Sequence, residues 1–193
     1  MNIILGSQSQ GRRAILYTLG YEFAVMAANI DERAIRSDDP RALTLALAHA
    51  KADALLPQIH QAALLITSDQ VVVWQGTIRE KPEHADKAHG FLRSYAEAPA
   101  ETVTAVVVTN TATGVRRQGV DLARVWFRRI PEAVIDQVIA QGEIFSYAGG
   151  FSITDPLLAA YIERVEGSTD SVIGLPKALT QRLIRAAMDS RAS

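Results

Sequence analysis

One stretch of this sequence constrains the fold more than any other: a run of apolar and polar β-forming residues, 64–73, that contains a single acid, Asp69. A run of this length is typical of a strand buried in a sheet. It predicts a strand over residues 64–74 that turns back at Gln75-Gly76 to form a hairpin with Ile78. Because burying a carboxylate is unfavourable unless it is paired or binds a metal, Asp69 is a candidate functional residue.

Strands and helices alternate along the rest of the chain, which predicts a mixed-sheet α/β fold. Apolar β-branched runs indicate the strands, and apolar residues at helical spacing indicate the helices. The expected strands are residues 2–5, 22–25, 101–109, 115–120, 121–127 and 159–165. The expected helices are residues 12–19, a helix that begins at Pro40, and residues 83–95, 131–141 and 176–188. Residues 148–150, Ala-Gly-Gly, are expected to form a flexible loop.

The length of 193 residues suits one domain, 1–193, built from two closely fused lobes with boundaries near residues 75–82 and 128–131. Hydrophobic residues make up 48% of the chain, which is enough for a sizeable core and argues against disorder. The formal charge of −1 lacks the basic excess of a general nucleic-acid binder. We therefore expect a single domain that binds no nucleic acid.

The chain contains no cysteine, which excludes disulfide frameworks, thiolate zinc sites and cysteine nucleophiles. Its first residues lack the basic region and the long apolar stretch of a signal peptide. No segment approaches the roughly 20 apolar residues that a transmembrane helix needs. These features predict a cytoplasmic protein with no membrane partner.

A polar loop between the first strand and the first helix has the pattern of an anion site. The polar and basic residues of this segment are Ser7, Ser9, Arg12 and Arg13. Backbone N–H groups and the helix dipole attract a phosphate at such a place, and cations in the first helical turn oppose that dipole unless an anion is held there. Arginines stand where a Walker P-loop has Lys-Ser/Thr, which disfavours a Walker-type NTPase. The two arginines could equally point into solvent or pair with nearby acids.

Two adjacent acids, Asp31 and Glu32, follow the second predicted strand. Together with Asp69 they could supply oxygen ligands for Mg²⁺ or Mn²⁺, which use one or two carboxylates plus substrate phosphates. The alternatives are a solvated turn for the adjacent pair, and for Asp69 a strand-end carboxylate that accepts hydrogen bonds from a loop.

Two lysines are candidate phosphate ligands. Lys51 lies at the edge of the apolar stripe of the helix that begins at Pro40, and Lys81 is held in an extended conformation by the following Pro82. Either could reach a phosphate as a point charge. Taken alone, each is more typical of a surface lysine.

Together these segments resemble the Maf family of nucleoside triphosphate pyrophosphatases over nearly the whole chain. Residues 5–13 resemble the family's Leu-Ala-Ser-x-Ser-Pro-x-Arg loop, and residues 47–52 resemble its Leu-Ala-x-x-Lys-Ala helix. Residues 68–72 are similar to its Ala-Asp-Thr/Gln-Val-Val strand, and Lys81-Pro82 is similar to its Gly-Lys-Pro. The C-terminal signatures are matched by residues 148–150 and 172–176. The order of these matches makes the resemblance specific.

The resemblance implies an elongated ITPase-like α/β fold, with a mixed sheet, flanking helices and two lobes around a central cleft. It implies hydrolysis of a nucleoside triphosphate, including modified or non-canonical ones, to the monophosphate and pyrophosphate, a house-cleaning reaction of the nucleotide pool. Asp69 would activate the attacking water, and Glu32 with Asp69 would hold a divalent metal, Mg²⁺ or Mn²⁺. The implied substrate-binding residues are Ser7, Ser9, Arg12, Arg13, Lys51, Lys81 and Gln70. Homodimers are common in the family, although no residue of this sequence indicates one.

The sequence departs from the family pattern at several places and looks closer to a divergent, plant-like subgroup. Gln10-Gly11 stands where the family has Pro and a specificity residue, and Ser146-Tyr147 stands where most members have Asp-Lys. Ile153-Thr154-Asp155 stands where many have Ile-Gln-Gly. Gln70 resembles the branch that prefers 7-methyl-GTP, but the flanking positions do not, so the base is left open. Tyr147 or Trp74 could stack on a base, although both are typical packing residues.

Two other functions remain open. The first is a non-catalytic nucleotide-binding regulator of septum formation and cell division, but a pure binder needs no buried water-activating acid. The second is a nucleic-acid-binding protein that uses Arg12, Arg13, Arg116 and Arg117. The near-zero charge and the few aromatic residues argue against it.

Overall fold

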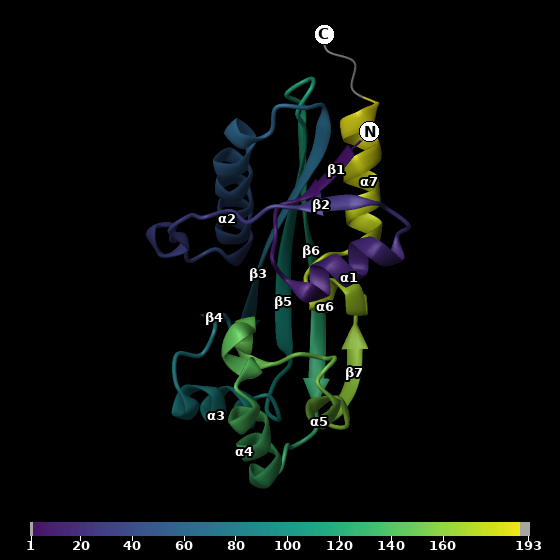
Figure 1. The fold of residues 1–193 in the computed structure, drawn as a ribbon. Helices are drawn as coiled ribbons and strands as arrows, with labels where there is room; N and C mark the ends of the chain where they lie inside the picture. The colour runs from purple at the N-terminus through teal and green to yellow at the C-terminus, as the bar shows by residue number, and fades with distance from the viewer. Residues whose placement is uncertain (1, 190–193) are drawn as a thin grey trace. The chain divides into compact units, whose positions relative to one another are not determined.

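The computed structural model describes residues 2–189, which divide into two compact units (Figure 1). Among the described residues, the first unit comprises 2–69, Thr104–Asp121 and 174–189, and the second comprises Gln70–Val103 and Leu122–Ile173. These boundaries differ from the expected ones near 75–82 and 128–131. The chain passes between the units inside long strands at 69/70, 103/104 and 121/122, and at the end of a short helix at 173/174.

The strands form a seven-stranded sheet in the order β2-β1-β3-β5-β6-β7, with β4 paired to β3. The strands are β1 (Asn2–Leu5), β2 (Phe23–Val25), β3 (Ala63–Trp74), β4 (Thr77–Arg79), β5 (Ala100–Asn110), β6 (Arg116–Phe127) and β7 (Ile162–Glu166). β1 pairs parallel with β2 and β3, whereas the β3–β4 and β6–β7 pairs are antiparallel. The predicted mixed α/β fold, a mixed sheet with flanking helices, is therefore confirmed.

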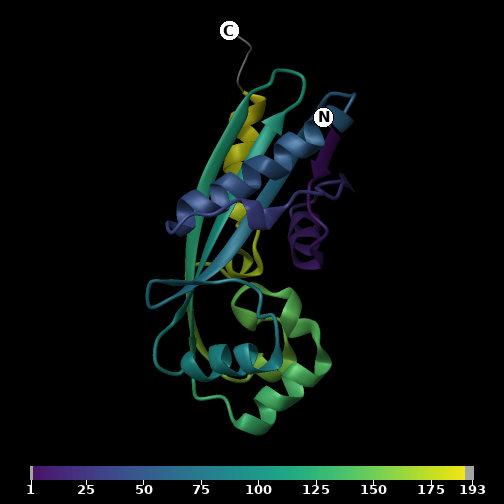
Figure 2. The same cartoon turned by 90° about the vertical axis from the view of Figure 1, so that its left-hand side faces the viewer.

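Helices α2 (Pro40–Leu55) and α7 (Lys177–Met188) cover opposite faces of the sheet in the first unit (Figures 1 and 2). α2 begins after Asp39, whose carboxylate accepts a hydrogen bond from the N–H of Arg41. Its apolar face packs against alternate residues of the strands, with Ala48 against Ala105 and Val107. The unit also contains α1 (Gln10–Thr18) and the 3-10 helices η1 (Glu32–Ala34) and η2 (Leu56–Gln58).

The second unit has a core of its own, to which β3, β5 and β6 contribute through the segments that belong to this unit. Tyr95, Phe127 and Phe151 form its aromatic centre, with ring centroids 5.3 to 5.7 Å apart. The helices of this unit are α3 (Ala85–Ser94), α4 (Glu132–Gln141), α5 (Pro156–Ala159) and α6 (Thr169–Ile173), with 3-10 helices η3 (Glu143–Ser146) and η4 (Ala148–Gly150).

Most predicted elements occur within a few residues of their expected positions, and three differ. Residues 115–120 and 121–127 form one continuous strand, β6, instead of two. The late strand expected at 159–165 begins only at Ile162, because Pro156 starts the short helix α5 before it. The expected flexible loop at 148–150 is a 3-10 turn in which Gly149 and Gly150 are buried.

Gly6 shows how closely the first unit is packed beside the predicted anion loop. A Cβ atom at Gly6 would lie 2.7 Å from both Leu55 Cδ1 and Thr67 Cγ2, while its N–H donates to the Ile66 carbonyl at 2.8 Å. The absence of a side chain at Gly6 therefore allows the loop after β1 to pack closely against α2 and β3.

We expect Gly6→Ala to lower the free energy of unfolding by about 1–3 kcal/mol, because the added methyl group overpacks this contact. Denaturant unfolding measures the change. The matched control is Gly90→Ala in α3, where a Cβ meets nothing within 4 Å. Removing a helical glycine there should stabilise the protein by up to about 1 kcal/mol. Equal effects of the two substitutions would contradict the packing account.

Candidate functional site

The centre of the candidate site is an ion-paired cluster in the first unit. The Lys51 ammonium on α2 lies 2.5 Å from Asp69 Oδ1 on β3 and 2.8 Å from Glu32 Oε1 on η1. Lys51 is 9% exposed and Asp69 is 7% exposed, whereas Glu32 reaches solvent. The structure thus brings together three residues that the sequence marked separately.

Local structure explains why these three side chains meet. Lys51 belongs to the buried face of α2, which also contains Leu47, Ala48 and Leu55. Thr67 ties β3 to that helix, since its hydroxyl donates to the Ala48 carbonyl at 2.8 Å. Asp69 lies two residues further along the same face of the strand, so it points toward the next turn of α2. The lysine is therefore buried, and the surface-lysine alternative is wrong for Lys51.

Burial raises the pKa of Asp69, and the nearby positive charges of Lys51 and Arg12 oppose this rise. The close ammonium stabilises the ionised carboxylate at this buried position. The alternative of a strand-end carboxylate bonded to a loop is also wrong, because Asp69 lies inside β3 and its partner is a lysine.

Arg12 organises the predicted anion loop by binding backbone. Its Nε donates to the Gly174 carbonyl and its Nη1 donates to the Ser68 carbonyl, both at 2.9 Å. The same Nη1 donates to Ser7 Oγ at 3.3 Å. Burial lowers the pKa of the guanidinium, with Asp69 and Glu32 opposing the shift. Arg12 thus turns inward, toward the backbone of Ser68, the residue before Asp69.

The other residues of the loop have distinct positions. Ser9 caps α1 and its hydroxyl accepts from the N–H of Arg12 at 3.3 Å, while Ser7 is buried. Arg13 is exposed, and one of its Nη atoms donates to the Gln8 carbonyl. Asp31 caps η1 through the N–H of Arg33, so of the two adjacent acids only Glu32 contacts Lys51.

Lys81 and Gln70 belong to the second unit. The Gln70 amide donates to the carbonyls of Ser171 and Val172, at 2.8 and 3.2 Å. Lys81 is exposed, and within residues 2–189 its ammonium has no hydrogen-bond or ion-pair partner. Both remain predictions as substrate-binding residues.

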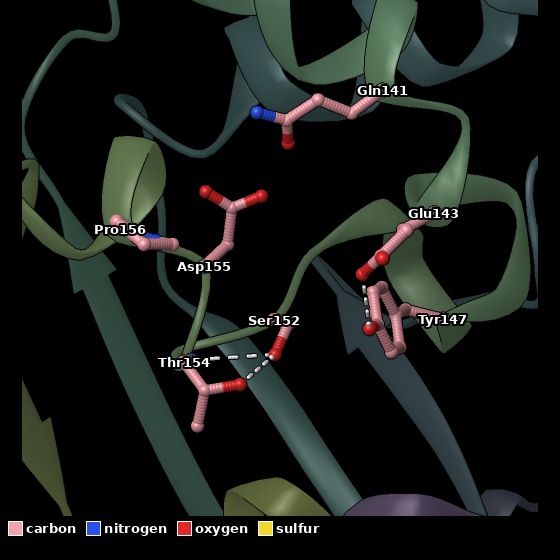
Figure 3. A pocket seen from close by; sticks show the side chains of 7 residues that line it. All are labelled: Gln141, Glu143, Tyr147, Ser152, Thr154, Asp155 and Pro156. Carbon is pink, nitrogen blue, oxygen red and sulfur yellow. Dashed lines mark hydrogen bonds between the residues drawn. The ribbon is translucent and has the colours of Figure 1, made fainter.

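A polar pocket of about 430 Å³ lies in the second unit, where the sequence departs from its family pattern (Figure 3). Its seven lining residues are Gln141, Glu143, Tyr147, Ser152, Thr154, Asp155 and Pro156. The Tyr147 hydroxyl donates to Glu143 at 3.2 Å, and burial raises the pKa of this tyrosine. Of the seven lining residues, two are carboxylates and none is a cation.

Several residues that build these regions do not stand out in the sequence. Ser68, fully buried, donates to the Gly174 carbonyl at 3.0 Å, so Gly174 accepts from both Ser68 and Arg12. Arg79 is buried among aromatic rings, and its guanidinium carbon lies 4.1 Å from the centroid of the Trp74 ring. That contact makes Trp74 a packing residue. The sequence carries little signal for the role of Ser68, since its partner Gly174 is 106 residues away.

Comparison with known proteins identifies the family. The family model described as "Maf-like protein" matches residues 2–187. The chain belongs to the Maf family.

Relatives of this Maf-family chain are pyrophosphatases by name. The 7-methyl-GTP pyrophosphatase of Dictyostelium discoideum is 42% identical over 189 residues, covering 94% of this chain and 95% of its own. The dTTP/UTP pyrophosphatase of Anaeromyxobacter dehalogenans is 35% identical and covers 96% of this chain and 93% of its own. A nucleoside triphosphate pyrophosphatase of Synechococcus is 33% identical and covers 95% and 92%.

The donor set of the Maf-family site suits a hard divalent cation. Glu32 and Asp69 offer carboxylate oxygens, and both converge on the same ammonium. Within the described part of the chain no group of three or more His, Cys, Asp or Glu residues is gathered. Two carboxylates completed by substrate phosphates are a usual arrangement for Mg²⁺, so the residues fit such an ion.

We expect Lys51→Met to lower the free energy of unfolding by about 3 kcal/mol, because it leaves the buried Asp69 carboxylate without its ion-pair partner. Adding Asp69→Asn to that chain should recover part of the loss, since the uncompensated charge is then gone. Denaturant unfolding of the two single variants and the double variant measures the coupling.

Lys87→Met is the matched control for this prediction. Lys87 pairs with Glu83 on the surface at 3.6 Å, four residues away, and such pairs contribute less than about 0.5 kcal/mol. A Lys51 variant no less stable than the Lys87 variant would contradict the importance of the buried pair.

Proposed function

We propose that this protein is a nucleoside triphosphate pyrophosphatase that releases the nucleoside monophosphate and pyrophosphate. The observation that carries the proposal is the buried carboxylate of Asp69, held at 2.5 Å by Lys51 and flanked by Glu32, in a chain that matches the Maf model over residues 2–187. A buried acid of this kind is an expensive feature for a fold, and it suits a group that accepts a proton during hydrolysis.

Asp69 is the proton acceptor in this proposal. Its carboxylate takes a proton from a water molecule as the water oxygen forms a bond to the α-phosphorus. The bond from the α-phosphorus to the oxygen that bridges the α- and β-phosphates breaks, and pyrophosphate leaves with that oxygen. The chain's own contribution is to place the base and to neutralise charge, as in phosphoryl transfer generally.

The basic and hydroxyl side chains bind the phosphates. Lys51 has three N–H donors, and Glu32 and Asp69 occupy two of them, which leaves one for a phosphate oxygen. Ser9 is the N-cap of α1 and Ser7 lies in the loop before it, next to the helix end where backbone N–H groups favour an anion. Arg12, Arg13, Lys81 and Gln70 complete the proposed set, carried over from the family pattern.

Glu32 and Asp69 would hold Mg²⁺ or Mn²⁺ in this proposal. When bound, such an ion neutralises phosphate charge and favours attack on phosphorus. The support is the oxygen-only donor set, which hard cations prefer.

The substrate is a modified or non-canonical nucleoside triphosphate, in keeping with relatives named for 7-methyl-GTP and for dTTP/UTP.

We propose that the two units act as a single Maf-like domain, since the family model spans segments of both. Within residues 2–189 no helix is long and apolar enough to cross a membrane. A cytoplasmic location, action without nucleic acid and assembly as a homodimer complete the proposal.

A regulator that binds nucleotides without hydrolysing them is the second candidate. The buried Asp69 with its lysine partner favours the enzyme, because a binder gains nothing from placing a carboxylate where phosphates are to be held.

We expect Asp69→Asn to lower kcat by about 10²- to 10⁴-fold, because the amide cannot accept the proton from water. Nucleotide binding, measured by calorimetry, should persist. The matched control is Asp38→Asn, an exposed acid of the same unit, which should retain normal turnover. Near-normal kcat in the Asp69 variant would remove it as the base.

Chelation of divalent metal by EDTA should abolish turnover, and adding Mg²⁺ or Mn²⁺ in excess should restore it. The reason is the charge of the triphosphate, which the described cations offset only in part. Pyrophosphate release is followed with and without metal. Full activity in the presence of EDTA would exclude the metal.

A further inference from the structure

We propose that Tyr95 is a positioning residue for Lys81: through the buried Gly149 turn, its hydroxyl fixes the backbone from which the lysine reaches a phosphate. This inference rests on the proposed function, in which Lys81 binds substrate. Every contact in it lies within the second unit.

The backbone on both sides of Lys81 is fixed although the lysine itself is exposed. The Glu80 carbonyl, immediately before it, accepts from the Gly149 N–H at 3.0 Å. Pro82, immediately after it, is buried, and its ring lies close to Gly150. The η4 turn therefore holds the segment from both ends and leaves the lysine side chain in solvent.

Tyr95 holds that turn from the opposite side. Its hydroxyl donates to the Gly149 carbonyl at 2.7 Å, so Gly149 is bonded through its N–H to Glu80 and through its carbonyl to Tyr95. Tyr95 is 1% exposed and its ring packs against Phe127 and Phe151. Burial raises the pKa of Tyr95 to about 12, so the hydroxyl remains a donor in neutral solution.

Gly149 can make both bonds because it has no side chain. Its φ is +67°, a conformation that favours glycine, and a Cβ atom would lie 2.7 Å from Val72 Cβ and 2.8 Å from the Tyr95 hydroxyl. The two hydrogen bonds that link Tyr95, Gly149 and Glu80 thus lie in a tightly packed region.

Arg79 anchors the other side of the same segment. Its guanidinium lies over the rings of Trp74, Phe91 and Tyr95, with the carbon 4.1, 4.6 and 5.0 Å from their centroids. It also donates to Ser94 Oγ at 2.8 Å. A buried cation is stabilised here by the faces of the rings. Tyr95 therefore contacts both Arg79, which precedes Glu80 in the chain, and Gly149, which is hydrogen-bonded to Glu80.

A fixed backbone matters for a lysine because the side chain is long and flexible. Binding a phosphate orders its rotatable bonds, at an entropic cost. If the main chain also moved, more freedom would be lost on binding. Tyr95 and Gly149 remove that part of the cost before the substrate arrives, which strengthens ground-state binding of the phosphates.

The test is a double-substitution cycle of Tyr95→Phe and Lys81→Met in the full-length chain. Tyr95→Phe keeps the ring and removes only the donated hydrogen bond. We expect it to raise KM for a nucleoside triphosphate about tenfold, the size expected for one buried hydrogen bond, with kcat changed less than about twofold. In the Lys81→Met chain the same substitution should change KM by less than about twofold. Tyr17→Phe, at a side chain 76% exposed, is the matched control and should change nothing.

A readout independent of substrate accompanies the kinetics. Hydrogen exchange of the Gly149 amide, which is bonded to Glu80, should become faster in Tyr95→Phe and stay unchanged in Tyr17→Phe. Faster exchange together with a KM effect that depends on Lys81 supports the proposal.

Three results would overturn it. Tyr95→Phe could change KM equally with and without Lys81, which is what a purely structural residue does. It could leave both KM and exchange at Gly149 unchanged. Lys81→Met could leave KM unchanged, which removes Lys81 from the site while the pyrophosphatase reaction stands.

Failure of the proposed function is recognised separately. If the unsubstituted chain releases no pyrophosphate from any nucleoside triphosphate, that function is wrong. The same cycle is then measured as binding of inorganic pyrophosphate by calorimetry. A Tyr95 effect that vanishes without Lys81 would still support the positioning role, and an effect independent of Lys81 would reject it.

Discussion

The contact between Lys51 and Asp69 is the interaction on which the rest of the site depends. β3 is a strand of a packed core, and an unpaired carboxylate inside it would oppose folding. The ammonium at 2.5 Å removes that penalty, provided that α2 lies close to the strand and in register with it. The Thr67 hydroxyl on the Ala48 carbonyl and the missing side chain at Gly6 satisfy this requirement. The geometry of the candidate base is thus a consequence of helix-on-sheet packing.

The second unit meets a related problem by different means. There the buried charge is a cation, Arg79, and the groups that stabilise it are aromatic faces and the Ser94 hydroxyl. The same rings belong to the core, so the charge and the apolar packing support each other. Each unit therefore contains a buried charge that neighbouring groups stabilise. In the first unit this charge is Asp69, the proposed base, and in the second it is Arg79, two residues before the proposed phosphate ligand Lys81. Preorganised charge of this kind suits a reaction in which positioning and neutralisation carry most of the catalysis.

Periodicity in the sequence predicts much of the fold, because it reports burial on one face. The β3–β4 hairpin, the helix beginning at Pro40 and the helix predicted at 131–141 are all read from local chemistry. The sequence predicts two strands, 115–120 and 121–127, whereas β6 is continuous, because a partly exposed acid such as Asp121 is tolerated within a strand. The short helices α5 and α6 are too brief to carry a periodic signal.

The candidate site was predictable in its members and much less in its contacts. Asp69, Glu32 and Lys51 stand out by type and position, but the ion pair that joins Lys51 to Asp69 forms across a helix and a strand 18 residues apart. The inward turn of Arg12 toward Gly174, 162 residues away, has no local signature either. Tyr95 and Arg79 resemble ordinary core and surface residues until the turn at Gly149 is seen beside them.

Hydrolysis in ¹⁸O-labelled water tests the central claim most directly. A panel of canonical and modified nucleoside triphosphates is turned over with Mg²⁺ or Mn²⁺, and mass spectrometry locates the label in the products. If water attacks the α-phosphorus, the products are monophosphate and pyrophosphate, and the label appears in the monophosphate alone. Label in pyrophosphate, or formation of diphosphate and orthophosphate, would mean attack at another phosphorus and would contradict the account of this site.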